Sequence, residues 1–311
     1  MTKRILSFGE MLWDLLPDGA VLGGAPFNFA YRAGTLGDDA LIVTALGRDD
    51  EGERAAEAAG ALGLDLSLVQ RNERPTGTVR VMFDEGRAPD YHIVPGVAYD
   101  HVEATDEVLT AAARADCICF GTLAQRREGA RSTLHRLLDA APNALTVLDI
   151  NLRKECYTAE SIASSLERAR VLKLNDEEVV TVAALFDLPA NPLPQFCEAI
   201  VDRYGLSHCV VTLAERGAVA LAKGEDAVYV PGFRVELADP LGAGDAFTAG
   251  FVHRLLRGRT PWECCELGNA LGAAVAELPG ATGELVPGRV EALLDGRAER
   301  IVDETLSVHA V

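Results

Sequence analysis

The sequence predicts an α/β fold in which helices cover both faces of a mostly parallel central sheet. Short apolar runs alternate with helical segments along most of the chain, and this alternation is typical of parallel strands buried under helices. Hydrophobic residues make up 49% of the 311 residues, which is enough for a large core. The predicted strands include residues 117–120, 145–150, 171–174 and 209–213, and the predicted helices include residues 127–141, 159–168, 177–185 and 194–204.

The first part of the chain follows the same pattern. Residues 5–8 form a short apolar run that we interpret as a first strand. A helix is expected from Pro26 to Gly37, because proline suits the first turn of a helix and glycine its C-terminal end. Residues 40–46 are then expected to form a strand, and residues 50–62, which are rich in Ala and Glu, a helix.

One segment breaks this alternation. Residues 78–94 alternate apolar and polar side chains around a polar turn, residues 84–90, which predicts a hairpin with one face in water. An edge hairpin without function is one interpretation of this pattern. The other is a small sheet that projects as a lid from about residues 11–22 and 77–97. No linker or repeat interrupts the chain, so we predict a single domain over residues 1–311.

The charge balance excludes several classes of partner. Lys and Arg number 29 and Asp and Glu number 47, so the net charge is −18 at pH 7. Such a surface repels phosphate backbones and anionic lipid, so neither nucleic acid nor a membrane is expected as a partner. The start of the chain lacks the apolar core of a signal peptide, and no run of about 18 apolar residues occurs, so we expect a cytoplasmic protein. The seven irregularly spaced cysteines are expected to be buried free thiols.

The sharpest motif is Gly242-Ala243-Gly244-Asp245, within residues 239–247. Its small residues let a ligand approach the backbone closely, and a helix is expected to begin at about Ala243. The free amides and the positive dipole end of a helix's first turn form an anion site. An ionised Asp245 in that turn could accept a proton from an attacking hydroxyl; the alternative is that it only stabilises the start of the helix.

Two common nucleotide-binding motifs are absent from the sequence. No Gly-x-x-x-x-Gly-Lys-Ser/Thr segment occurs, which excludes a P-loop protein. After Gly242 and Gly244 the third glycine of a dinucleotide-binding motif is replaced by Phe247, which disfavours a Rossmann site.

Three other segments carry residues suited to binding. Gly24 and Asn28 lie at the start of a helix, where the Asn28 amide offers a donor and an acceptor to a polyol, although two glycines before a helix are often only a turn. Arg153 follows a strand end and could steady a phosphate or a sugar, or be an ordinary surface arginine. Asn175 and Glu178 could face one ligand, with Glu178 holding a water of Mg²⁺; they also fit a helix capping box.

Taken together, these segments resemble the ribokinase-like, or PfkB, carbohydrate kinases. One signature of that family is matched from Gly23 to Gly47 and another from Asp239 to Val252. The Asn175-x-x-Glu178 element and the predicted hairpin agree with the family's order, and the resemblance covers residues 8–282. It implies a ribokinase-like three-layer fold with a small β-sheet lid, and the activity of an ATP-dependent sugar kinase.

The resemblance also implies roles for individual residues on the acceptor side. Asp245 resembles the catalytic base, and the amides before it resemble the anion hole that meets the transferring phosphoryl group. The implied anion-hole residues are Gly242, Ala243 and Gly244, and the implied substrate-binding residues are Asp14, Gly24, Asn28 and Arg153.

On the nucleotide side, the resemblance implies that ATP and Mg²⁺ are held by Asn175, Glu178, Thr212, Gly217 and Asn269, with Mg²⁺ reached from Glu178 through water. Asp239, with nearby carbonyl groups, resembles a site for a monovalent cation such as K⁺.

Within the family, residues 9–14, 75–78 and 120–126 are similar to fructokinases, so fructose is the expected acceptor and fructose 6-phosphate the expected product. The same chemistry on 2-keto-3-deoxygluconate, ribose or a nucleoside is the near alternative. A non-catalytic sugar-binding protein on the kinase fold is an alternative of another class. Pairing of the lid strands between two copies would make a homodimer.

Overall fold

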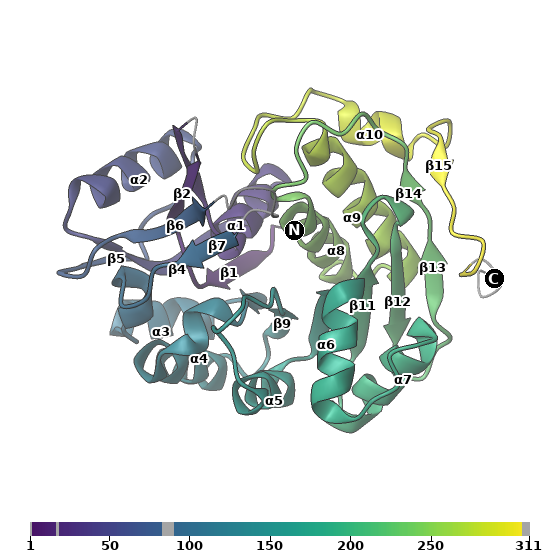
Figure 1. Ribbon diagram of the computed structural model, residues 1–311, viewed down its shortest axis with the longest axis horizontal. Helices are drawn as coiled ribbons and strands as arrows, with labels where there is room; N and C mark the ends of the chain where they lie inside the picture. The colour runs from purple at the N-terminus through teal and green to yellow at the C-terminus, as the bar shows by residue number, and fades with distance from the viewer. Residues whose placement is uncertain (1, 17–18, 83–89, 307–311) are drawn as a thin grey trace.

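A nine-stranded sheet lies at the centre of the protein (Figure 1). The computed structural model describes residues 2–16, 19–82 and 90–306. The strands are β1 (Arg4–Phe8), β4 (Asp39–Gly47), β5 (Val69–Asn72), β8 (Cys117–Phe120), β9 (Leu145–Asp149), β10 (Val171–Asn175), β11 (His208–Thr212), β12 (Ala218–Ala222) and β13 (Val228–Val230). Their order is β13-β12-β11-β10-β9-β8-β1-β4-β5, parallel from β5 to β11 and antiparallel at β12 and β13.

Helices cover both faces of this sheet (Figure 1). One face packs against α1 (Ala25–Thr35), α8 (Ala243–Leu255) and α9 (Pro261–Ala276). The other packs against α3 (Asp106–Ala113), α4 (Glu128–Ala140), α5 (Ala159–Arg168), α6 (Asp176–Phe186) and α7 (Leu193–Tyr204).

The sequences of these strands are nearly continuous apolar runs because both faces of the strands are buried. Successive side chains of a strand point to opposite faces, so Ile5 joins the core beneath α8 and Leu6 the core beneath α4. The predicted mostly parallel, doubly covered sheet is therefore confirmed, and its predicted strands and helices lie at nearly the expected bounds.

A separate four-stranded sheet forms the lid. Its strands are β2 (Leu12–Leu16), β3 (Gly19–Gly23), β6 (Gly77–Met82) and β7 (Asp90–Ile93), in the order β3-β2-β6-β7. Helix α2 (Asp50–Ala61) packs beside it, where the Trp13 indole donates a hydrogen bond to the Glu51 carbonyl at 2.9 Å. The small sheet was predicted; most of the polar turn predicted at residues 84–90 lies outside the described residues.

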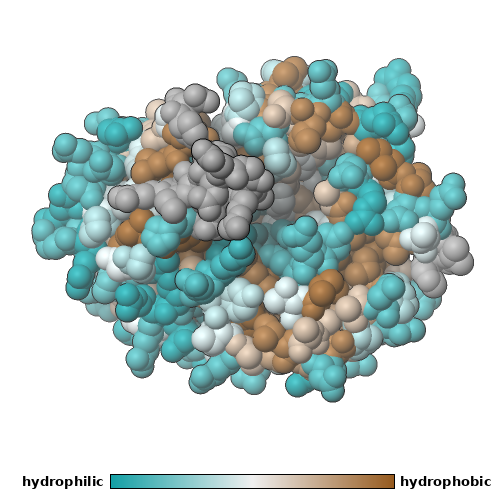
Figure 2. All heavy atoms as spheres, viewed as in Figure 1, coloured by the Kyte–Doolittle hydropathy of each residue, from teal (hydrophilic) through white to brown (hydrophobic). Residues whose placement is uncertain are grey.

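The C-terminal part of the chain closes the molecule beside α9. Helix α10 (Arg289–Leu294) packs on α9, and β14 (Gly232–Phe233) pairs with β15 (Arg300–Ile301). All seven cysteines are buried and free, as expected. No helix in the described part of the chain is long and apolar enough to cross a membrane. In Figure 2, hydrophilic side chains cover most of the left edge of this face, on the side of α2.

Candidate active site

The site lies where the parallel strands end. Asp149 and Asn175 end β9 and β10, Thr212 ends β11, and Glu10 follows β1. Because parallel strands share their carboxyl edge, these residues meet at one rim of the sheet. The N-terminal end of α8 points at the same rim and supplies Asp245 from its first turn. The fold thus gathers residues that are far apart in the sequence.

The turn before α8 requires glycine at position 242. Gly242 is the N-cap with a φ of 78°, in the left-handed region. A Cβ atom there would lie 2.3 Å from the Cβ atom of Ala281, which no side chain tolerates. The turn therefore holds the backbone of Ala243 and Gly244 at the open end of a helix, where the first-turn amides have no helical partners.

Asp245 is held from the acceptor side by α1. The Asn28 amide donates a hydrogen bond to the Asp245 carboxylate at 2.8 Å, and the Asp245 side chain is only 9% exposed. Burial raises the pKa of Asp245 to about 6; the charge of Asp149 adds to the rise, and Asn28, Lys173 and Arg153 oppose it. The buried side-chain carbonyl oxygen of Asn28 has no hydrogen-bond partner among the described residues, so it is an acceptor left unpaired beside Asp245.

A buried ion pair lies beneath the α8 turn. The Lys173 ammonium is 3.0 Å from the Asp149 carboxylate, and Thr248 donates to the other Asp149 oxygen at 2.7 Å. A Cβ atom at Gly244 would lie 3.4 Å from the Lys173 nitrogen, so this cation is next to the predicted anion hole. Burial opposes its charge, but Asp149 and Glu178 outweigh burial and raise the pKa of Lys173. Sequence reasoning missed Lys173, although a lysine in the apolar run of residues 171–174 was a signal.

The predicted nucleotide-side residues line one cavity of about 510 Å³. Gly217, at a φ of 97°, is required there because a Cβ atom would lie 2.1 Å from the Val230 carbonyl oxygen. Asn269 is fixed by a hydrogen bond from its side-chain amide to the Val230 carbonyl at 3.0 Å. The predicted residues that meet around this cavity are Asn175, Thr212, Gly217, Asn269, Ala243 and Gly244, together with Lys173.

Glu178 and Asp239 both bond to the backbone. Glu178 forms the capping box with Asn175: its carboxylate accepts the Asn175 amide at 2.9 Å and, through the second oxygen, the Leu152 amide at 2.8 Å. The Asp239 carboxylate accepts the amides of Leu241 at 2.9 Å and Gly280 at 3.0 Å. Their roles toward Mg²⁺ and a monovalent cation stay predictions.

On the acceptor side, Asp14 approaches the Gly23–Gly24 turn with its carboxylate and Glu10 approaches it with its backbone. A Cβ atom at Gly23 would lie 2.7 Å from the Asp14 carboxylate, and one at Gly24 would lie 2.5 Å from the Glu10 carbonyl oxygen. Burial raises the pKa of Glu10 to about 7 and that of Asp14 to about 6, while the charge of Arg153 opposes both rises. Sequence reasoning missed Glu10, because the pattern of apolar and polar residues does not predict that this carboxyl group is buried beside the end of β1.

Asn151 connects the two sides of the site. It lines the cavity that holds Asn175 and Gly244, and also a small cavity that contains Glu10 and Asp149. Its φ of 39° places it in the left-handed region, uncommon outside glycine. The nucleotide-side and acceptor-side residues therefore meet around one backbone segment.

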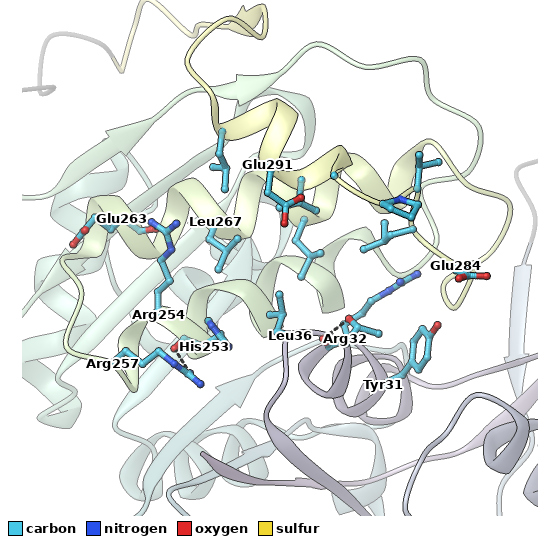
Figure 3. A pocket seen from close by; sticks show the side chains of 18 of the residues that line it. Tyr31, Arg32, Leu36, His253, Arg254, Arg257, Glu263, Leu267, Glu284 and Glu291 are labelled. Atoms are coloured by element: carbon cyan, nitrogen blue, oxygen red, sulfur yellow. Dashed lines mark hydrogen bonds between the residues drawn. The ribbon is translucent and has the colours of Figure 1, made fainter. Parts of the chain in front are cut away.

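A larger cavity lies elsewhere, between α1, α8, α9 and α10 (Figure 3). Its volume is about 860 Å³, and it is lined by none of the residues predicted for the site. Its basic side chains His253 and Arg257 both contact the Asp38 carboxylate, at 2.7 and 2.6 Å. The candidate site is therefore chosen by its carboxylates and its helix N-terminus, and not by the volume of its cavity.

The sequence model of the pfkB family carbohydrate kinases matches residues 19–287, a range that contains Gly24, Asn28 and Asp245. The chain belongs to this family. It is therefore a sugar kinase, an enzyme that transfers a phosphoryl group to a sugar.

Two relatives of the kinase illustrate the range of named acceptors. The ATP-dependent 6-phosphofructokinase of Thermoanaerobacterium thermosaccharolyticum is 25% identical over 299 residues, covering 90% of each chain. The fructokinase of Escherichia coli is 26% identical over 266 residues, covering 81% of this chain and 84% of the relative.

Solved structures confirm the predicted ribokinase-like fold. A fructokinase from Xylella fastidiosa with bound ATP superposes with a TM-score of 0.82 at 22% identity, covering 95% of this chain and 99% of the other. A 2-dehydro-3-deoxygluconokinase from Thermotoga maritima superposes with a TM-score of 0.83 at 20% identity, also covering 95% of this chain and 99% of the other.

Proposed function

We propose that this kinase transfers the γ-phosphoryl group of ATP to a hydroxyl of a neutral sugar, with fructose as the first candidate and Asp245 as the general base. The observation that carries this proposal is the position of the Asp245 carboxylate. It is bonded to Asn28 on the acceptor side at 2.8 Å, and it shares a helix end with residues 243 and 244, which line the 510 Å³ cavity. A hydroxyl at Asp245 would thus lie beside donors for a phosphoryl group.

The pKa of Asp245 suits a base. A value of about 6 leaves the carboxyl group mostly ionised at neutral pH, yet basic enough to take a proton from a hydroxyl as the new O–P bond forms. General-base help of this kind is worth about 10²–10⁴ in rate. The hydrogen bond from Asn28 holds the carboxylate in one orientation, so the proton acceptor need not reorganise during the reaction.

The helix end and Lys173 suit the other half of the reaction. In phosphoryl transfer, negative charge spreads over the three equatorial oxygens of the transferring group. The amides of Gly242 and Gly244 and the positive end of α8 offer fixed donors for those oxygens. The Ala243 amide, which donates to the Pro240 carbonyl at 3.3 Å in the ligand-free fold, would have to exchange that bond for one to the phosphoryl group. Lys173, next to Gly244, adds a full positive charge that is already oriented by Asp149.

The residues of the 510 Å³ cavity fit ATP and Mg²⁺. Asn175, Asp176 and Glu177 bring the oxygen donors that Mg²⁺ prefers to its rim, and Glu178 behind them retains lone pairs for a metal-bound water. Mg²⁺ bound with ATP would neutralise phosphate charge. Thr212, Gly217 and Asn269 are proposed to hold the nucleotide. Asp239 likewise retains lone pairs for a monovalent cation such as K⁺.

The charges of the acceptor side favour a neutral sugar. Three carboxyl groups, those of Glu10, Asp14 and Asp245, interact with a single exposed cation, Arg153. The other nearby cations are already paired: Arg126 with Asp100 at 2.7 Å, and Lys173 with Asp149 at 3.0 Å. An acceptor with its own carboxylate or phosphate would meet net repulsion, whereas sugar hydroxyls can bond to the carboxylates and to the free oxygen of Asn28. The relative named fructokinase supports this preference, whereas the relative named 6-phosphofructokinase does not.

A panel of acceptors in an ADP-release assay tests the proposal. Fructose, ribose, adenosine, 2-keto-3-deoxygluconate and fructose 6-phosphate would each be supplied with ATP and Mg²⁺. We expect kcat/KM for fructose to exceed that for either anionic acceptor by at least about tenfold. A preference for an anionic acceptor would overturn the neutral-sugar assignment, and no ADP release with any acceptor would overturn the proposed transfer.

We further propose that two copies pair through the lid. Leu15 and Leu16 of β2 are large apolar side chains that are more than a third exposed, and β3 and β7 are the edge strands of the lid sheet. Exposed apolar side chains and open strand edges are features that a second copy can cover.

A further inference from the structure

Arg32 is a buried cation with no carboxylate partner among the described residues. Its side chain is 0% exposed and is the largest fully buried one in the described chain. The guanidinium donates to the Ala281 carbonyl from Nε at 3.2 Å and from Nη2 at 2.6 Å, and Nη2 also donates to the Gly283 carbonyl at 2.9 Å. Nη1 has no partner. Burial lowers the pKa of Arg32, and the adjacent Tyr31 opposes this.

Such a group is expensive to bury. A charge taken out of water without a counterion loses its hydration, and carbonyl dipoles replace that hydration only in part. An apolar side chain of similar length would fill the same space at lower cost. An arginine at this position therefore indicates a role beyond packing. The two carbonyl groups that it bonds to identify the part of the structure on which it acts.

Those carbonyls belong to the loop that supports the α8 turn. Ala281 lies directly against Gly242, since a Cβ atom on Gly242 would approach the Ala281 Cβ atom to 2.3 Å. The Asp239 carboxylate joins the same two segments by accepting the amides of Leu241 and Gly280. The loop of residues 280–283 therefore packs behind the Gly242–Gly244 turn, which is the proposed anion hole. Arg32 donates hydrogen bonds to the same loop from the side of α1.

Arg32 also shares a helix face with a residue of the acceptor site. Asn28 and Arg32 are four residues apart on α1, so their side chains lie on one face. Asn28 bonds to Asp245, and Arg32 bonds to the loop behind Gly242. In Figure 3 the Arg32 side chain extends from α1 toward the chain segment that carries Glu284. One helix therefore steadies both the base and the backbone that precedes it.

We propose that Arg32 is a positioning residue for phosphoryl transfer: it fixes residues 280–283 and, through Ala281, the amides of the Gly242–Gly244 turn. This inference rests on the proposed function of that turn. Arg32 does not touch the acceptor-side groups of Asn28, Asp14 or Asp245, so its loss should lower kcat and leave the KM for the sugar nearly unchanged.

Arg32→Ala with chemical rescue tests this role. Arg32 lines the 860 Å³ cavity, so its removal leaves a space that a guanidinium ion can reach from that cavity. We expect kcat with the preferred sugar to fall on the order of tenfold to a hundredfold, with the KM for that sugar changed less than about twofold. Millimolar guanidinium chloride should restore part of kcat, and sodium chloride at the same concentration should not. Arg32→Lys should retain an intermediate kcat.

Arg254→Ala is the matched control. Arg254 lines the same cavity, but it donates a hydrogen bond to the Glu263 carbonyl at 3.4 Å rather than to the loop of residues 280–283. The kcat of Arg254→Ala should therefore equal that of the wild type, and guanidinium chloride should not increase it. A wild-type kcat for Arg32→Ala, or a loss that guanidinium does not reverse in a variant with native circular dichroism, would overturn the inference. If Arg32→Ala does not fold, the Arg32→Lys variant provides the test instead. A kcat for Arg32→Lys equal to that of the wild type would then overturn the inference. An inactive wild-type enzyme would instead overturn the proposed function.

Discussion

Asp245 is in a setting that makes its protonation state matter. Its raised pKa means that the folded protein favours the neutral acid, so the ligand-free fold loses stability from this group as pH rises from about 4 through 6. A base needs the ionised form. Under the proposed mechanism, the group that costs stability above pH 6 is therefore also the one that accepts the proton there.

We predict that kcat/KM falls as pH drops through about 6, approaching tenfold per pH unit below it, because protonated Asp245 cannot accept the proton. A pH–rate profile with the preferred sugar measures this. Burial also raises the pKa values of Glu10 and Asp14 into this pH range, so the Glu10→Gln variant is the control. Its pH–rate profile should still show kcat/KM declining below about pH 6. A profile that stays flat down to about pH 5 would contradict the assignment.

Individual residues of the site differed in how far the sequence revealed them. Asp245 and the glycines before it were predicted because small residues at a helix start let a ligand approach the backbone, and because the segment resembles a signature of the PfkB kinases. Glu10 and Lys173 were missed because a carboxylate after a strand and a lysine within one are ordinary on a surface, and only the tertiary fold buries them. Arg32 was predicted to lie on a helix, but its burial depends on a loop some 250 residues later in the chain.

Among the elements, the lid is the one that we propose to pair with a second copy. If two copies pair through it, Leu15→Ser/Leu16→Ser should shift the protein toward monomer, because the variant removes apolar surface that the dimer would bury. Sedimentation equilibrium at micromolar concentration measures the state of both proteins. A monomeric wild type, or a variant dimer of unchanged affinity, would exclude pairing through these residues.

The helices and parallel strands were predicted because their apolar runs and their proline and glycine boundaries are local signals. The antiparallel strands β12 and β13 were not among the predicted elements, since they are short and their pairing depends on β11. The turn between β11 and β12 also holds a feature that local pattern cannot supply: Ala214 has a φ of 51°, a conformation that glycine adopts more readily.

At the scale of the whole molecule, one consequence of the topology explains the site. A parallel sheet collects the ends of its strands along one rim, so residues from β1, β9, β10 and β11 meet there despite their separation in the chain. This gathering was predictable in outline. The net charge of −18 did not predict the buried Lys173 beside the proposed anion hole, because a local cation inside an acidic protein leaves little trace in the composition.

Replacement of Asp245 by asparagine tests the central claim most directly. Asp245→Asn removes the proton acceptor while preserving shape, and Asp139→Asn, at an exposed carboxylate paired with Arg168, is the matched control. Turnover and sugar affinity would be measured for both variants with the preferred sugar. We predict that Asp245→Asn loses about 10²–10⁴ in kcat while still binding the sugar, and that the control behaves as the wild type. A kcat for Asp245→Asn within about tenfold of wild type would contradict the claim that this carboxylate is the base.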